Sequence, residues 1–268
     1  MPELPEVEAV VRKVRAAATG AMIQGVRVLR DRATHPQAPV VLAESAGQRI
    51  LSVERRGKNI VVRLTGGLAL RVHLRMTGNL TVIPDFRLHA ATVRVVFELE
   101  DGRGLVLDDA RVLGMVHLLT EPRLQQELSG IGVDPLSDDF TASFLVSATG
   151  ASRRPAKMFL MDQHPIAGLG NIYVAESLFR ARIHPAHPVN ELRRPRINAL
   201  HQAIRDVLQQ ALPDAIASYE HPGRHEGMSY RVYDREGLPC LTCGSLIGRI
   251  AQGGRSTYYC PKCQKEFR

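Results

Sequence analysis

The pattern of apolar and polar positions predicts a helix close to the N-terminus. Over residues 6–19 the apolar side chains recur at the i, i+3, i+4 and i+7 spacing of one helix face, at Val7, Val10, Val11 and Val14. Glu6 and Glu8 suit the positive end of this helix, and Gly20 ends it. The segment Met1–Pro5 matches neither a helix nor a strand. The predicted helix therefore fixes the position of the extreme N-terminus.

Between residues 22 and 119 the pattern changes to short β-type runs. The predicted strands are Ile23–Leu29, Ile50–Arg55, Ile60–Leu64, Leu68–Leu74, Leu80–Ile83, Thr92–Glu98, Leu105–Asp108 and Gly114–Leu119. Turn signals such as Gly66-Gly67 and Asp101-Gly102 separate several of them. Many short strands at this spacing predict an antiparallel sandwich or a barrel-like domain.

After a linker at residues 130–135, which is rich in glycine, the pattern becomes helical. It predicts helices over 141–149, 171–181 and 191–212, the last with its true start near Pro195. Residues 219–228 are polar and rich in Gly and His, which predicts a loop. These changes predict an α+β protein with domains at 1–130, 131–228 and 229–268.

An excess of basic residues indicates a polyanionic partner. The chain carries 35 Lys and Arg against 27 Asp and Glu, a formal net charge of +8. Such an excess favours nucleic acid or an anionic membrane surface, although a merely soluble basic surface gives the same count. No run approaches the roughly 18 to 20 apolar residues of a membrane span, and the acidic N-terminus is unlike a signal peptide. We therefore expect a cytoplasmic protein without a membrane segment.

The four cysteines form one motif at the C-terminal end. Two Cys-x2-Cys knuckles are separated by sixteen residues, and their members are Cys240, Cys243, Cys260 and Cys263. This spacing matches the tetrahedral four-thiolate site of a zinc ribbon, with strands over 246–250 and 256–259 joined by Gly253-Gly254. Four thiolates leave no open coordination position, so we predict one structural Zn²⁺. A thioredoxin-like redox site predicts only one Cys-x-x-Cys.

Three segments occur in the same order in one known family. They are the N-terminal run Pro2-Glu3-Leu4-Pro5-Glu6-Val7-Glu8, the segment Gly170-Asn171-Ile172-Tyr173 that leads into Ala175–Phe179, and the cysteine motif. On these segments the chain resembles the formamidopyrimidine-DNA glycosylases, within the wider family that includes endonuclease VIII. Leu4 favours the formamidopyrimidine branch, because endonuclease VIII proteins usually have Gly there.

The resemblance implies both an architecture and a partner. An N-terminal antiparallel β-sandwich flanked by helices is followed by a helical helix-two-turn-helix domain with a C-terminal zinc ribbon. Damaged double-stranded DNA is bound in the cleft between the domains, and we expect the protein to act as a monomer.

The resemblance also implies catalytic roles near the N-terminus. Once Met1 is removed, the secondary amine of Pro2, with an α-amino pKa of about 8, supplies free base at neutral pH. By resemblance Pro2 is the nucleophile, Glu3 the proton donor to the deoxyribose ring oxygen, and Lys58 a phosphate contact that assists proton transfer. Glu6 is expected to orient the N-terminus. The alternative for the pair Pro2-Glu3 is a plain N-terminal helix cap.

Two groups of DNA contacts follow from the same resemblance. The phosphate contacts are His73, Lys157, Asn171 and Arg255, and the residues that fill the hole left by an extruded base are Met76, Arg111 and Leu113. An apolar wedge offsets part of the unstacking cost, and an arginine donates to the orphan base. For Met76 and Leu113 the alternative is core packing.

The chain departs from the family pattern in three places. Leu113 and Val112 replace a phenylalanine and an arginine, and Arg75 stands where glycine is usual. The segment 219–230 corresponds to the base-covering loop of the family and matches no particular lesion.

The resemblance implies a bifunctional DNA glycosylase and AP lyase that excises oxidised purines, chiefly 8-oxoguanine and formamidopyrimidines. One alternative is an endonuclease VIII-like preference for oxidised pyrimidines, and another is a non-catalytic protein that binds damaged DNA. A zinc-ribbon transcription or translation factor leaves the N-terminal match unexplained.

Overall fold

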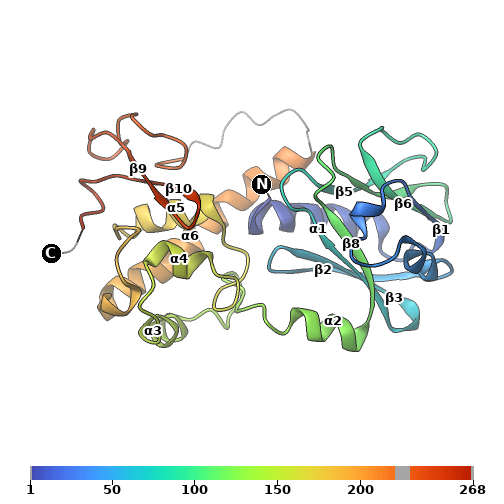
Figure 1. Ribbon diagram of the computed structural model, residues 1–268, viewed down its shortest axis with the longest axis horizontal. Coiled ribbons are helices and arrows are strands. Elements are labelled where there is room, and N and C mark those ends of the chain that lie inside the picture. Colours follow the sequence, from blue (N-terminus) through green and yellow to red (C-terminus); the bar gives the residue numbers. More distant parts are fainter. Residues whose placement is uncertain (1, 221–229, 267–268) are drawn as a thin grey trace. The chain divides into compact units, whose positions relative to one another are not determined.

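The computed structural model describes residues 2–220 and 230–266, which fall into two compact units, Met1–Gly130 and Ile131–Arg268 (Figure 1). Among the helices of the described residues, none is both long enough and apolar enough to span a membrane.

Two four-stranded antiparallel sheets and a helix that packs against both form most of the first unit. One sheet has the order β1-β6-β7-β5 and the other β2-β3-β4-β8. The strand bounds are β1 Ile23–Val28, β2 Ile50–Arg56, β3 Asn59–Leu64, β4 Leu68–His73, β5 Asn79–Ile83, β6 Val93–Leu99, β7 Gly104–Asp108 and β8 Met115–Thr120. All eight predicted strands are therefore present, with ends that move by one residue at most.

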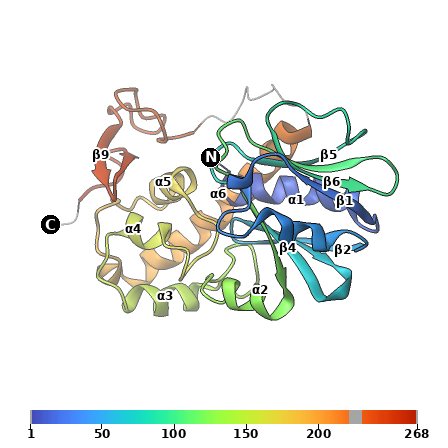
Figure 2. The same cartoon turned by 45° about the vertical axis from the view of Figure 1, so that its right-hand side comes forward.

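Helix α1 (Leu4–Ala18) contacts β2 and β3 of one sheet and β5 of the other (Figure 2). The predicted valine stripe is at most 1% exposed, at Val7, Val10, Val11 and Val14. The expectation that Met1–Pro5 lies outside the helix is wrong at its last two residues, since the helix begins at Leu4. Pro5 is tolerated there because the first turn of a helix needs no N–H donor.

Shorter elements complete the first unit. Three 3₁₀ turns, η1 (Asp31–Ala33), η2 (Pro39–Ser45) and η3 (Thr65–Gly67), connect strands. Helix α2 (Glu121–Leu128), which the sequence pattern did not predict, follows β8. It buries only Leu124 and Leu128, and two apolar positions are too few to produce a clear helical period.

The second unit is helical and ends in the cysteine module. Its elements are α3 (Ala142–Gly150), α4 (Ala156–Met161), α5 (Asn171–Arg180), the 3₁₀ turn η4 (Val189–Glu191), α6 (Arg194–Glu220) and the hairpin β9 (Gly248–Gln252) and β10 (Arg255–Tyr259). Helix α5 contacts α4, α6 and β10. This position makes α5 the centre of the unit.

Helix α6 corrects the predicted helix over 191–212. It begins at Arg194, one residue before Pro195, and continues past Pro213 to Glu220. Pro213 removes one backbone hydrogen bond inside this helix, and Ala215, which follows it, is completely buried. The predicted loop over 219–228 lies outside the described residues, except for its first two positions, which belong to α6.

The cysteine module packs on α5 through a small apolar core. Ala175 and Phe179 of the helix meet Val232 and Ile247 of the module, together with the buried Cys240 and Cys260. The predicted α+β architecture, with antiparallel sheets, a helical region and a terminal cysteine module, is confirmed.

Candidate nucleic-acid interface and zinc centre

Glu3 and Glu6 form a capping box at the start of α1. Glu3 is the N-cap residue, its N–H donates to Glu6 Oε2 at 2.7 Å, and its side chain accepts from the backbone N–H of Glu6. Glu3 is 1% exposed, whereas Pro2 is half-buried. The start of the helix therefore places Pro2 beside a buried carboxylate. The alternative, that Pro2-Glu3 only caps the helix, agrees with this geometry as well.

Lys58 and His73 lie at the same end of the sheet β2-β3-β4-β8. Lys58 is in the turn between β2 and β3, and His73 ends β4 opposite Asn59. Burial, together with the charges of Arg75, Lys58 and Arg71, lowers the pKa of His73 to about 4. The N–H of Arg75 donates to His73 Nδ1 at 3.1 Å, which leaves the proton of the neutral ring on Nε2. This sheet end therefore offers an imidazole donor among cations, a setting suited to an anion.

The three predicted wedge residues lie on two turns of the first unit. Met76 is 47% exposed in the turn after β4, and Arg111 is exposed in the turn before β8, with its Nη1 3.8 Å from Met76 Sδ. Leu113 is half-buried on the second turn. The exposure of Met76 disfavours core packing, while Leu113 is compatible with both readings.

Both turns contain a backbone conformation that L-residues rarely adopt. Arg75 has φ 56° and Val112 has φ 54°. Each directly precedes a wedge residue, Met76 or Leu113. A left-handed conformation costs a non-glycine residue about 1 to 2 kcal/mol, and a β-branched side chain suits it particularly badly. Arg75 and Val112, which differ from the usual residues of the family, are therefore strained, and other contacts must hold their backbone in this conformation.

Asp109 is the group that sequence reasoning missed at this site. It is 1% exposed, and its carboxylate accepts from the Thr77 hydroxyl and from the backbone N–H groups of Arg111, Leu113 and Gly114. Burial alone would raise its pKa, but these hydrogen bonds lower it below the ordinary value. The signal for it in the sequence is weak, because an Asp that precedes a Gly-containing turn is common.

In the second unit, Lys157 and Asn171 meet on one strand of the cysteine module. Lys157 Nζ and Asn171 Nδ2 both donate to the carbonyl oxygen of Ser256, each at 3.0 Å. Lys157 is fully buried on α4, whereas Asn171 is half-buried at the start of α5 and Arg255 is exposed at the start of β10. The structure thus brings three predicted phosphate contacts together, but the lysine ammonium lies beneath the surface because it bonds to β10.

The four cysteine sulfurs form a site that fits zinc. Their Sγ atoms all lie within 4.8 Å of one another, with Cys243 and Cys260 at 3.5 Å and Cys240 and Cys263 at 4.0 Å. A tetrahedral site with Zn–S bonds of about 2.3 Å has sulfur–sulfur edges of about 3.8 Å. The donor set and its dimensions therefore agree with the predicted structural Zn²⁺.

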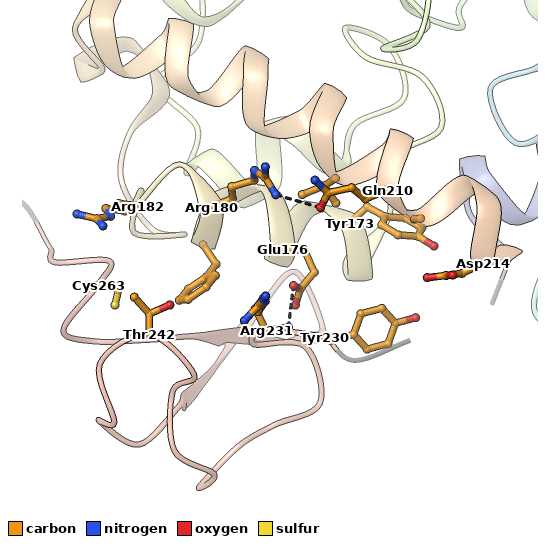
Figure 3. Close-up of a pocket in the computed structure, with 13 residues that line it drawn as sticks. Tyr173, Glu176, Arg180, Arg182, Gln210, Asp214, Tyr230, Arg231, Thr242 and Cys263 are labelled. Carbon is orange, nitrogen blue, oxygen red and sulfur yellow. Dashed lines mark hydrogen bonds between the residues drawn. The ribbon is translucent and has the colours of Figure 1, made fainter. Parts of the chain in front are cut away.

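A cavity of about 550 Å³ lies within the second unit between α5, α6 and the segment after residue 230 (Figure 3). Glu176 forms part of its wall, and its carboxylate accepts from the backbone N–H groups of Arg231, Val232 and Tyr233 at 2.8 to 2.9 Å. This carboxylate fastens the module to α5. Of the predicted site residues that the structure describes, only Cys263 lines the cavity.

Comparison with known proteins places these features in one family. Residues 1–116 match the formamidopyrimidine-DNA glycosylase N-terminal domain, residues 131–220 the H2TH domain of the same enzymes, and residues 237–265 the zinc finger found in FPG and IleRS. The formamidopyrimidine-DNA glycosylase of Chloroflexus aurantiacus is 41% identical over 98% of both chains. That of Cereibacter sphaeroides is 38% identical over 99% of this chain and 100% of the relative.

Solved structures agree with the sequence comparisons. The Lactococcus lactis formamidopyrimidine-DNA glycosylase, non-covalently bound to DNA that contains an AP site, has a TM-score of 0.88 and 29% identity, over 98% of this chain and 100% of that chain. A mutant of that enzyme in complex with DNA containing Fapy-dG has a TM-score of 0.89. The predicted resemblance is confirmed over the full length: the chain belongs to the formamidopyrimidine-DNA glycosylase family and is a DNA-repair glycosylase with a structural zinc finger.

Proposed function

We propose that this glycosylase excises oxidised purines from double-stranded DNA and then cleaves the strand as an AP lyase. The observation that carries the proposal is the capping pair of the buried Glu3 and the half-buried Glu6, which lies directly after Pro2 at the start of α1. A nucleophile needs a fixed position next to a proton donor, and this arrangement supplies both.

In the proposed reaction the nitrogen of Pro2, after removal of Met1, attacks C1′ of the damaged nucleoside. The bond from C1′ to the base breaks, its electron pair leaves with the base, and the base takes up the proton that the proline nitrogen loses. Glu3 gives a proton to the deoxyribose ring oxygen as the ring opens. The secondary amine forms an iminium that cannot lose an N–H proton, so it stays positively charged and accepts electrons during β-elimination and then δ-elimination.

The remaining predicted residues bind the DNA in this proposal. Lys58 and His73 contact phosphates from the first unit, and Asn171 and Arg255 from the second. Lys157 acts through β10, since its ammonium is bonded to Ser256 and Thr257. Met76, Arg111 and Leu113 fill the space that the extruded nucleotide leaves.

The protein is further proposed to act as a monomer in the cytoplasm. The bacterial sources of its relatives support this location, and so does the DNA that the solved relatives contain.

Borohydride trapping on a panel of duplexes tests the proposal. Each duplex carries one lesion: 8-oxoguanine, a formamidopyrimidine, an oxidised pyrimidine or an abasic site. A reduced covalent adduct that forms fastest on the oxidised purines supports the proposal. Faster trapping on the oxidised pyrimidine would instead indicate an endonuclease VIII-like enzyme, and tight binding without any adduct would indicate a non-catalytic damage-binding protein.

A further inference from the structure

The carboxylate of Asp109 joins the two turns that carry the wedge residues. Its Oδ1 accepts from the Thr77 hydroxyl, on the turn after β4, and from the N–H of Arg111 at 3.1 Å. Its Oδ2 accepts from the N–H groups of Leu113 and Gly114 at 2.6 Å each. One buried side chain thus contacts both turns and no solvent.

The backbone beneath the second turn is held from another side. Arg94 is 7% exposed, and its guanidinium donates to the carbonyl oxygens of Asp109 at 2.7 Å and Ala110 at 3.3 Å. Gly114 is tightly placed as well, because a Cβ there would lie 3.2 Å from Asp109 Oδ2. The second turn is therefore fixed by contacts to its backbone, while Met76 and Arg111 stay exposed.

These contacts also account for the two strained residues. Arg75 and Val112 have left-handed backbone conformations that neither side chain favours. Such conformations persist when the surrounding structure over-determines them. The N–H groups that Asp109 binds lie on both sides of Val112, and the Thr77 hydroxyl lies two residues after Arg75. Without the carboxylate, each turn loses one of the contacts that hold it in its strained conformation.

We propose that Asp109 is the positioning residue of the wedge: it holds the turns of residues 74–78 and 109–114 in the one arrangement that inserts Met76, Arg111 and Leu113 together into a DNA stack. This inference rests on the proposed function, since it assumes that these three residues enter the duplex. It adds a residue that contacts neither base nor phosphate. Asp109 acts only through the turns that it joins.

The variant Asp109→Asn tests the proposal, because it keeps the shape but places an NH₂ donor against N–H donors. Asp85→Asn is the matched control, since Asp85 also accepts a backbone N–H, that of Arg87, in another turn of the unit. We expect single-turnover excision of 8-oxoguanine opposite cytosine to slow about ten- to a hundredfold, the cost of lost hydrogen bonds to a charged group. Cleavage of a preformed abasic site, which needs no base extrusion, should change much less.

A binding measurement separates this inference from the proposed chemistry. 2-Aminopurine beside an abasic-site analogue brightens when the wedge opens the stack, whether or not the protein is a lyase. We expect Asp109→Asn to lose most of the brightening seen with wild type and with Asp85→Asn. Equal slowing on both substrates, or unchanged brightening, would overturn the role of Asp109. A wild-type protein that brightens the probe but forms no borohydride adduct would overturn the proposed function alone.

A second variant covers the case in which Asp109→Asn fails to fold. Thr77→Val keeps the shape of the side chain and removes only the bond between the two turns. It should also slow excision more than cleavage of an abasic site, but by a smaller factor, about threefold to tenfold for one hydrogen bond. Wild-type behaviour of Thr77→Val in both assays would show that the turns are not coupled through the carboxylate.

Discussion

Lys157 Nζ donates to the carbonyl oxygen of Ser256 at 3.0 Å, although the two residues are 99 positions apart. The same ammonium donates to the hydroxyl of Thr257 at 2.5 Å. Strand β10 is thereby tied to α4 at the two residues that follow Arg255. The strand that carries Arg255, a proposed phosphate contact, is thus connected to the helical part of its unit.

Lys157 makes the stability of the protein depend on pH in the alkaline range. Burial and the nearby Arg255 lower the pKa of Lys157 from 10.5 to about 8. Between pH 8 and 10.5 the unfolded chain therefore binds more protons at this residue than the folded protein does. Its contribution to the free energy of unfolding thus rises with pH over that window, by about 3 kcal/mol in all.

Urea unfolding at several pH values between 8 and 10.5 measures this rise. Lys157→Met keeps the buried stem and should flatten the curve relative to wild type. Lys265→Met, at an exposed lysine of the same unit, is the control and should leave the slope unchanged. A Lys157→Met curve as steep as the wild-type curve would rule out this lysine as the source.

Much of this fold could be predicted because its elements have strong local periods. The strands from β1 to β8 alternate or run apolar between turn residues, and the valine stripe of α1 marks one buried face. The spacing of the cysteines alone predicts the zinc site that the sulfur distances support. Each of these features depends on residues that are close together in the chain, so the local sequence is enough to predict it.

The features that escaped prediction depend on partners far away in the chain. The burial of Lys157 follows from β10, and the role of Asp109 depends on Thr77, 32 residues earlier. From sequence alone, an isolated lysine or aspartate is predicted to be solvent-exposed, because these residues are rarely buried. The left-handed backbone at Val112 was equally unpredictable, because a valine argues against it.

Blocking the N-terminus should abolish chemistry without abolishing binding. Retention of Met1, or the substitution Pro2→Gly, changes the one nitrogen that the mechanism uses, while the phosphate contacts remain. We expect borohydride trapping to fall below detection for the Met1-retaining protein, with affinity for an abasic-analogue duplex within about threefold of wild type, as for loss of at most one weak contact. Excision of 8-oxoguanine at wild-type rate by the blocked protein would remove Pro2 from the nucleophile role.

The zinc site should determine how well β10 presents Arg255. Cys260 is completely buried, and its N–H donates to Gln264 Oε1 at 2.9 Å, while Gln264 Nε2 donates to the carbonyl oxygen of Ile183. Cys260→Ser should release the metal and loosen this connection, with DNA binding weakened about tenfold or more, as expected for loss of a charged phosphate contact. Thr242→Ser, in the other knuckle but not a ligand, is the control.

Elemental analysis and salt-dependent DNA binding provide the measurements. Freshly purified wild type and Thr242→Ser should each contain one zinc per chain, and Cys260→Ser much less. Zinc-free wild-type protein that binds DNA normally would contradict the structural role of the metal.

Leu113 should stabilise the opened base stack less well than the phenylalanine that is usual in the family. A leucine covers less area than phenylalanine and has no π-face to stack on a base. Leu113→Phe should therefore speed excision of 8-oxoguanine from a stable pair with cytosine, by about threefold to tenfold for a stacking gain of about 1 kcal/mol. Single-turnover rates on paired and mismatched duplexes measure the effect. A slower Leu113→Phe enzyme would show that the half-buried site cannot admit the ring.

Arg111 should read the base opposite the lesion. Its guanidinium is exposed 3.8 Å from Met76 Sδ, and its backbone is fixed by Asp109. Two of its N–H groups match the adjacent acceptors O2 and N3 of an orphan cytosine, whereas adenine presents a donor in the same region. A good bidentate contact is worth about 1 to 3 kcal/mol of discrimination, or roughly 5- to 150-fold.

Single-turnover excision of 8-oxoguanine opposite each of the four bases tests this reading. Arg111→Ala should flatten the preference for cytosine and slow every duplex somewhat. Arg111→Lys separates charge from geometry, because it keeps the cation that attracts phosphate but loses the planar fork. If Arg111 acts through charge alone, Arg111→Lys retains the preference. If Arg111 reads the base, Arg111→Lys loses the preference for cytosine but keeps most of the affinity for DNA. An unchanged cytosine preference in Arg111→Ala would exclude the reading role altogether.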